Sequence, residues 1–276
     1  LPLVLERGGR ITVRATLPKV HEGQSLMVKI NYSSLCVKVD GQTIYSVGET
    51  SFGMIRTMVG NFIAFAPMQD QYSGKTVELE ITSRDAHFSS AVKHIGVVSL
   101  SDFIVAQAQK YMLNLLVAIL YCLLGVLMFG LWLVFTFRRV PLEEYSKEAF
   151  AYAGIFLLSI GIWTFSDVHL AGMALHNLTA SGLMNYLSFS LLPVGCMGMV
   201  RYMYAKSSPT FQFLLSLVHL NFLVQCALFL LGIRDFTQML PVTQIVCIIT
   251  VVTFIAAAAM DMLRNPVTEK KVNALT

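Results

Sequence analysis

Charged side chains are scarce in this chain, and their scarcity excludes an ordinary soluble protein. Asp, Glu, Lys and Arg make up 13% of the 276 residues, whereas hydrophobic residues make up 55%. A soluble globular domain carries about 25% charged residues. The mean hydropathy is +0.66. The composition therefore predicts an integral membrane protein.

Excess charge of one sign is also absent, because the formal net charge is only +4. The basic residues lie beside apolar runs and form no patch interleaved with aromatic residues, so we expect no nucleic-acid partner. Charges occur at ordinary density up to about Lys110 and only in short clusters after it. This uneven distribution predicts two regions, one in water and one in a lipid bilayer.

Cysteines and catalytic motifs are equally sparse. Of five cysteines, only Cys36 precedes the apolar runs, which leaves no disulfide framework in one soluble domain. A Gly-rich phosphate loop, HExxH, paired CxxC and GxSxG are all missing, so we expect no enzyme activity in this chain and no cofactor. Asp167, His169 and His176 could bind a metal, but solvated side chains explain such a group more often, and we predict no metal site.

Alternating residues dominate the first hundred positions. Apolar and polar side chains alternate over 11–16, 26–30 and 77–82, which is typical of strands with one buried face. The pair Asp40-Gly41 between VKV and QTIYS favours the tight turn of a β-hairpin. We therefore predict an extracytoplasmic all-β sandwich of jelly-roll type over residues 1–100.

This sandwich could bind a small molecule near its loops, where aromatic and charged residues gather. For each candidate the alternative is ordinary packing in the core or at its rim, since scattered aromatic residues need no special explanation. The candidate ligand-binding residues are Tyr45, Phe52, Arg56, Tyr72, Arg84 and Asp85.

Five apolar runs within 113–263 are long enough to cross a hydrocarbon core, which takes about 20 helical residues. Basic residues flank alternate connections and the tail at 264–276, which places the C-terminus in the cytoplasm and the sandwich outside a plasma (inner) membrane. The expected spans are Leu113–Phe137, Ala149–Ser166, Leu183–Tyr204, Phe211–Gly232 and Met239–Leu263.

The junction at 101–112 contains neither Gly nor Pro, and Ser101-Asp102 is a plausible helix cap. We expect one helix to run from the sandwich into the first span. A stiff connection of this kind could carry a movement across the bilayer, which a flexible linker could not. A simple anchor is the alternative.

Polar residues inside the spans are costly in lipid and often functional. His219, Asn221 and Gln225 in the fourth span are the main candidates, with interhelical hydrogen bonding as the simpler interpretation. Pro193 with nearby glycines should kink the third span or let it pack closely. Further residues expected to hold the bundle together are Asn114, Asn185, Ser188, Ser190 and Gln244.

The segments LPKV, VDGQTIYSVGE, KTVELEITS and IGVVSLSDF precede a multi-span bundle directly. This arrangement resembles the bacterial seven-transmembrane receptors with diverse intracellular signalling modules, in particular those that end in a GGDEF diguanylate cyclase. The resemblance implies an outer domain that senses a ligand, often suspected to be a carbohydrate. It also implies helices that relay the signal to a cytoplasmic output module, a diguanylate cyclase or a kinase.

The chain departs from this family in having five spans and no output domain. Five and seven are both odd, so the expected side of the C-terminus is unchanged. The chain begins at Leu1, and we expect a targeting segment before it and further spans with an output module, in cis or in trans, after Thr276. The leading hypothesis is a transmembrane signalling receptor, and a homodimer is one oligomeric state that it could adopt. A membrane anchor or accessory protein is the first alternative, and a transporter component is the second.

Overall fold

We describe the protein from a computed structural model, which covers residues 9–31, 33–48, 61–83, 94–138, 144–168, 178–204 and 209–264. The chain divides into two compact units. The first unit comprises Leu1–Cys122, Ile160–Phe189 and Ala227–Gln238, and the second comprises Leu123–Ser159, Ser190–Cys226 and Met239–Thr276.

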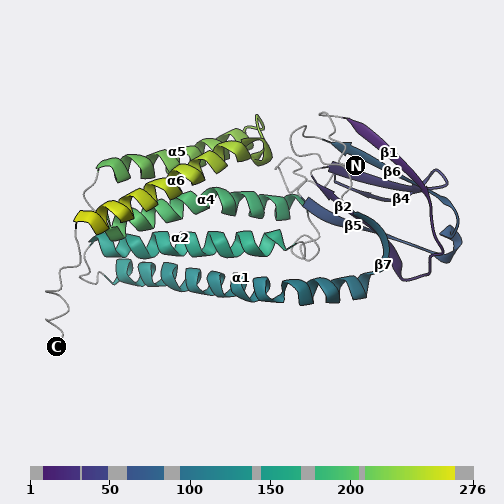
Figure 1. Ribbon diagram of the computed structural model, residues 1–276, viewed down its shortest axis with the longest axis horizontal. Coiled ribbons are helices and arrows are strands. Elements are labelled where there is room, and N and C mark those ends of the chain that lie inside the picture. The colour runs from purple at the N-terminus through teal and green to yellow at the C-terminus, as the bar shows by residue number, and fades with distance from the viewer. Residues whose placement is uncertain are drawn as a thin grey trace. The chain divides into compact units, whose positions relative to one another are not determined.

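Seven strands in the first unit form two antiparallel sheets (Figure 1). Successive strands mostly alternate between the two sheets, as in a jelly roll. The four-stranded sheet has the order β1 (Arg10–Thr16), β6 (Thr76–Ser83), β3 (Ser33–Val39) and β4 (Gln42–Val47). The three-stranded sheet has the order β5 (Asn61–Pro67), β2 (Gln24–Asn31) and β7 (His94–Ser99). A short 3-10 turn, η1 (Asp70–Tyr72), lies between β5 and β6 and was not predicted.

One apolar core joins the two sheets. Val37 and Leu79 pair directly in the four-stranded sheet, and both are buried together with Val28 and Ala64 of the three-stranded sheet. Their neighbours along each strand point to the opposite face, because side chains alternate along a strand. The predicted β-sandwich is therefore confirmed.

The predicted hairpin at Asp40-Gly41 is present between β3 and β4. Val39 pairs with Gln42, and the two turn residues have positive φ angles of 49° and 81°. Positive φ at both positions matches the right-handed twist of the flanking strands, and Gly41 adopts it without steric cost.

Among the described residues, five helices are long and apolar enough to cross a membrane, and the chain is a multi-pass membrane protein. They extend at most ends beyond the predicted spans, although the fourth ends before the predicted Gly232. Their bounds are α1 (Leu100–Phe137), α2 (Glu144–Asp167), α4 (Leu178–Tyr204), α5 (Pro209–Leu230) and α6 (Phe236–Arg264).

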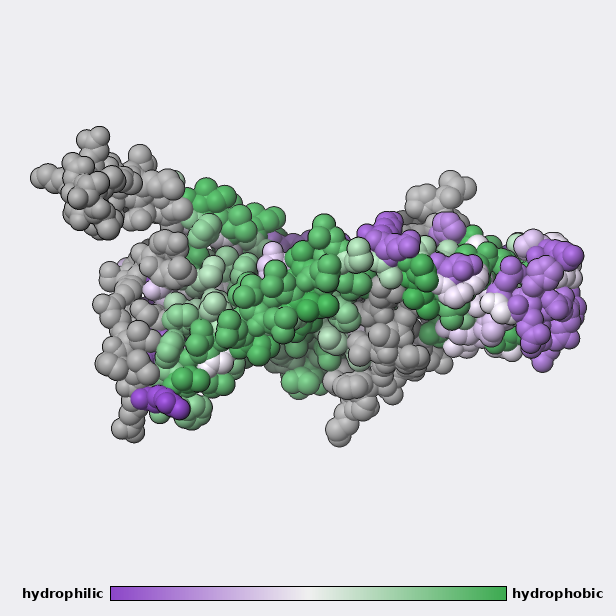
Figure 2. Space-filling view, turned by 90° about the horizontal axis from the view of Figure 1, so that it is seen from below, coloured by the Kyte–Doolittle hydropathy of each residue, from purple (hydrophilic) through white to green (hydrophobic). Residues whose placement is uncertain are grey.

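The helices differ in how much of each is covered by protein. In the most apolar window of α4, 50% of residues are buried, against 11% in α1. The exposed residues of α1 are mostly large and apolar, as lipid contact requires, and Figure 2 shows green apolar surface along the helices and purple hydrophilic residues on the sandwich. Helix α4 is therefore the more enclosed helix, whereas the chain itself covers little of α1.

Helix α1 follows β7 without an intervening residue, since β7 ends at Ser99 and α1 begins at Leu100. The helix thus starts one residue before the predicted cap at Ser101, whose hydroxyl lies 2.8 Å from that of Ser99. It then continues unbroken for 38 residues, as the lack of Gly and Pro at the junction predicts. Strand β7 therefore continues directly into the helix of the first span, and no flexible linker lies between them.

The first turn of α1 also packs on the sandwich. The ring of Phe103 lies 5.1 Å from that of Phe65, edge to face, on the outer side of the three-stranded sheet. Phe65 pairs with Met27, which is only 7% exposed although it points away from the core. The outer face of this sheet is therefore covered here, and the beginning of α1 forms part of that cover.

Candidate functional site

The aromatic candidates of the sandwich pack against its core. Tyr45 on β4 and Tyr72 in η1 are both half-buried and contact the apolar cluster between the sheets. The Lys75 ammonium group lies 6.0 Å from the centre of the Tyr72 ring. Core and rim packing thus accounts for these two side chains. The other candidates, Phe52, Arg56, Arg84 and Asp85, lie outside the described residues.

Tyr45 bridges the neighbouring edges of the two sheets. Burial raises the pKa of its hydroxyl, while a backbone hydrogen bond at Phe65 acts in the opposite direction. Phe65 belongs to β5 and also contacts Phe103 of α1. Tyr45, Phe65 and Phe103 therefore connect the four-stranded sheet, the three-stranded sheet and the start of α1.

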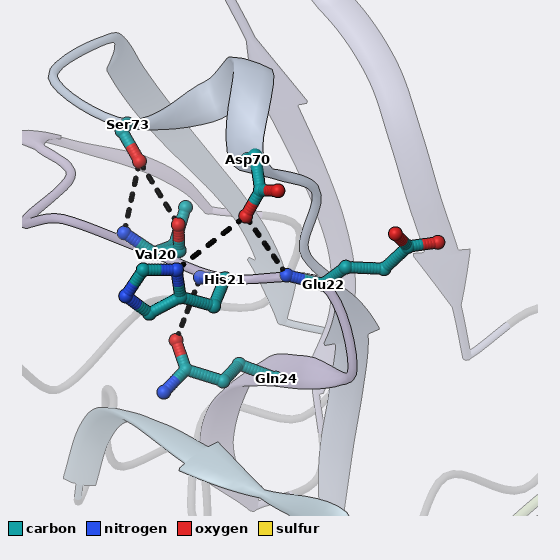
Figure 3. Close-up of polar contacts among 6 residues, drawn as sticks. All are labelled: Val20, His21, Glu22, Gln24, Asp70 and Ser73. Carbon is teal, nitrogen blue, oxygen red and sulfur yellow. Dashed lines mark hydrogen bonds and ion pairs between the residues drawn. The ribbon is translucent and has the colours of Figure 1, made fainter.

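Two loops at one end of the sandwich are held together by polar contacts (Figure 3). The Ser73 hydroxyl accepts a hydrogen bond from the Val20 amide at 2.9 Å and donates one to the Val20 carbonyl at 3.0 Å. Asp70 Oδ1 accepts from the Glu22 amide at 3.1 Å and lies 3.6 Å from His21 Nδ1. These bonds satisfy backbone groups of the loops and fix their conformation.

A ladder of charges covers the outer face of the four-stranded sheet. Glu80 contacts both Arg10 and Lys38, and its oxygen lies 2.7 Å from Lys38 Nζ. Hydrogen bonds from Lys38 and then Arg10 lower the pKa of the Glu80 carboxyl. Arg14 and Glu78 pair at 2.8 Å. Each carboxylate on this face thus has a cationic partner among the described residues, and Glu80 has two.

Gln225 lies at the centre of a buried polar cluster in the second unit, which we call the Gln225 cluster and which consists of Ser190, Asn221, Gln225 and Thr243. Gln225 Oε1 accepts from Ser190 on α4 at 3.2 Å and from Thr243 on α6 at 3.1 Å. Its Nε2 donates to Thr243 at 2.9 Å and to Asn221 on α5 at 3.1 Å. Gln225 is 3% exposed and Thr243 is 1% exposed. The cluster thus joins three helices at one level.

Three other polar residues that were expected to bond between helices do not do so among the described residues. The Ser188 hydroxyl bonds within its own helix, to the carbonyl oxygens of Met184 and Asn185. Asn114 and Gln244 are exposed, which contradicts the prediction that they bond between helices. Sequence alone fixes neither the rotation of a helix nor which side of it faces a neighbour.

His219 belongs to a second group of side chains in the same unit. Its Nδ1 donates to the Leu215 carbonyl at 2.7 Å, so in the neutral ring Nε2 is the acceptor and faces the Tyr152 hydroxyl at 3.4 Å. Tyr152 stacks on Tyr202 with 5.5 Å between ring centres, and the Arg201 guanidinium lies 5.0 Å from the Tyr202 ring. The group joins α2, α4 and α5.

Glycines bring the helices into close contact around α2. A Cβ atom on Gly195 of α4 would lie 2.6 Å from the Phe156 nitrogen, and one on Gly125 of α1 would lie 2.8 Å from the Leu158 nitrogen. A Cβ on Gly161 of α2 would lie 3.0 Å from the Cys122 nitrogen. Helix α2 is thus held backbone to backbone between α1 and α4, as Gly195 with Pro193 partly predicted.

The side chains found in these groups are suited to hydrogen bonding and packing. Among the described residues, no three His, Cys, Asp or Glu side chains are grouped so that they could hold a metal ion. Of the earlier metal candidates, His169 and His176 lie outside the described residues. Buried donors without a partner in the described part of the chain are Trp132 Nε1, Ser166 Oγ and Asn221 Nδ2.

Sequence reasoning found Gln225, Asn221 and His219 but missed Tyr152, Tyr202 and Thr243. A tyrosine or threonine in an apolar run carries no signal by itself, because both residue types are common in membrane helices. Comparison with known proteins adds nothing here, since no protein-family model matches the chain and no curated protein is similar to it.

Proposed function

We propose that this protein is a transmembrane receptor whose outer sandwich binds a small molecule and whose helices relay the bound state to a cytoplasmic output module. The basic connections favour a cytoplasmic C-terminus. The resemblance to seven-transmembrane receptors favours a carbohydrate as ligand and a bacterial plasma membrane as location. In this proposal any catalytic step belongs to the output module and not to the residues described above.

The β7–α1 junction is the observation that carries the proposal. Ser99 ends a strand of the sandwich and Leu100 begins the helix that becomes the first span. Phe103 then packs on Phe65 of the neighbouring strand. A ligand that shifts the three-stranded sheet would therefore move α1 with it, because neither a flexible linker nor a loose contact separates them.

Close helix contacts would pass this movement on. Gly125 and Gly161 bring α1 against α2, and Gly195 brings α4 against α2, so that no side chain separates the helices at these points. The Gln225 cluster then joins α4 to α5 and α6. A receptor needs a packed path of this kind, whereas a simple anchor needs only apolar surface.

The proposal is tested with the full chain in lipid nanodiscs and a panel of mono- and disaccharides. We expect at least one sugar to raise the melting temperature of the sandwich in a saturable manner and to change hydrogen exchange in α4 and α6. A matched variant replaces 106–109 with Gly-Ser-Gly-Ser. In this variant the melting shift should remain and the exchange response should disappear, because the flexible segment interrupts α1.

Each alternative gives a different result. A sugar that stabilises the sandwich without any exchange response in the wild-type bundle would favour an anchor that carries a binding domain. An exchange response that survives the Gly-Ser-Gly-Ser replacement would contradict relay through α1. If no sugar on the panel binds, the carbohydrate ligand class is wrong.

A further inference from the structure

Two membrane helices carry a proline beside the Gln225 cluster. Pro193 lies inside α4, and Pro241 lies inside α6. A proline has no N–H, so each takes away the helical hydrogen bond to the carbonyl four residues earlier, at Phe189 and Thr237. Each helix is therefore weakened locally and can bend there more easily than elsewhere.

Gln225 bonds to both weakened helices within one turn of their prolines. Ser190 precedes Pro193 by three residues, and Thr243 follows Pro241 by two. Both hydroxyls bond to the same Gln225 amide group, at 3.2 Å from Ser190 and at 2.9 and 3.1 Å from Thr243. One side chain of α5 thus fixes the position of α4 relative to α6 at the level where each can bend.

One donor in the cluster is unused. Asn221 Oδ1 accepts from Gln225 Nε2, but Asn221 Nδ2 is buried and has no partner in the described part of the chain. A buried N–H without an acceptor is unfavourable, and it favours any rearrangement that supplies an acceptor. The described arrangement therefore satisfies the Gln225 amide and leaves one buried N–H of the neighbouring Asn221 without an acceptor among the described residues.

We propose that Gln225 is a clamp across two proline hinges, and that releasing it lets α4 and α6 bend at Pro193 and Pro241. The clamp is a property of the bundle alone. It is therefore independent of whether the sandwich binds a ligand and of what the output module does.

Hydrogen exchange of the full chain in lipid nanodiscs tests the clamp. Gln225→Met keeps the volume of the side chain and removes its hydrogen bonds. We expect exchange in 186–200 and 237–250 to become at least tenfold faster while exchange in α1 and α2 stays unchanged. Gln244→Met is the matched control, because Gln244 is an exposed glutamine of α6, and it should leave both segments unchanged.

Two smaller changes keep the test decisive if Gln225→Met does not fold. Ser190→Ala removes only the bond to α4 and should accelerate exchange mainly in 186–200. Thr243→Val removes the bonds between Gln225 and α6, together with the bond of the hydroxyl to the Met239 carbonyl, and should act mainly in 237–250. Unchanged exchange in both segments, or an equal acceleration in all five helices, would overturn the proposal.

Discussion

The sandwich and the helical bundle place polar and apolar side chains in opposite ways. In the sandwich, Leu79 and Val28 are buried while Glu80 and Arg10 lie on the outer face. In the bundle, Leu116 is 58% exposed whereas Gln225 is buried. Water favours burial of apolar groups, but lipid does not distinguish an apolar interior from an apolar surface. The sandwich is therefore stabilised by its apolar core, and the bundle by close packing and hydrogen bonds.

The largest effect should come from enlarging a side chain where two helices of the bundle are in close contact. Gly195→Leu would push a side chain into the backbone of Phe156. We therefore expect the free energy of unfolding to fall by ~3 kcal/mol or more, a large part of the stability of a typical protein. Size-exclusion profiles of detergent-extracted protein measure this. Gly130→Leu is the matched control, since a Cβ there meets no atom within 4 Å and should be tolerated. Equal tolerance of both variants would contradict close packing at Gly195.

Burial of leucine should matter in the sandwich and not on the lipid-facing surface. Leu79 is 2% exposed in the core, so Leu79→Ala should cost about 2–5 kcal/mol. Leu116→Ala on α1 should stay within ~0.5 kcal/mol, because 58% of the residue is exposed. Hydrogen exchange of sandwich and bundle segments in the full chain reports both. A large effect of Leu116→Ala would show that protein, and not lipid, covers this part of α1.

The smallest effect concerns the paired charges on the outer face of the four-stranded sheet. Bonds from Lys38 and Arg10 lower the pKa of Glu80 in the folded state. Their stabilisation is present above the ordinary carboxyl pKa and is lost as the pH falls through the lowered value. The melting temperature of the sandwich should therefore fall more steeply on acidification in the wild type than in Glu80→Gln.

Glu22→Gln serves as the control for this titration, since it removes an exposed carboxylate from the loop before β2. It should retain the acid sensitivity of the wild type. If Glu80→Gln is as sensitive to acid as the wild type, the contacts of Glu80 with Lys38 and Arg10 do not contribute to stability.

The features that the sequence predicts correctly are those that depend on a short stretch of chain. Alternation shows the strands, Asp40-Gly41 shows the hairpin, and apolar length shows the five helices. The partners of Gln225 could not be predicted, because they depend on how three helices are rotated and packed. The same holds for Asn114 and Gln244. Like Ser190, each is a polar residue inside an apolar run, but both are exposed whereas Ser190 is buried. The packing of Phe103 on Phe65 joins residues distant in the chain and carries no local signal either.

The rigid β7–α1 junction is the central claim, and a distance measurement tests it most directly. Spin labels at Thr12→Cys on β1 and Leu113→Cys on α1, both exposed, would report on it after the native cysteines are replaced. Our account predicts one narrow distance distribution that broadens when Phe103→Ala removes the contact with Phe65. A broad distribution in the protein with Phe103 intact would contradict it, because the sandwich and α1 would then move independently.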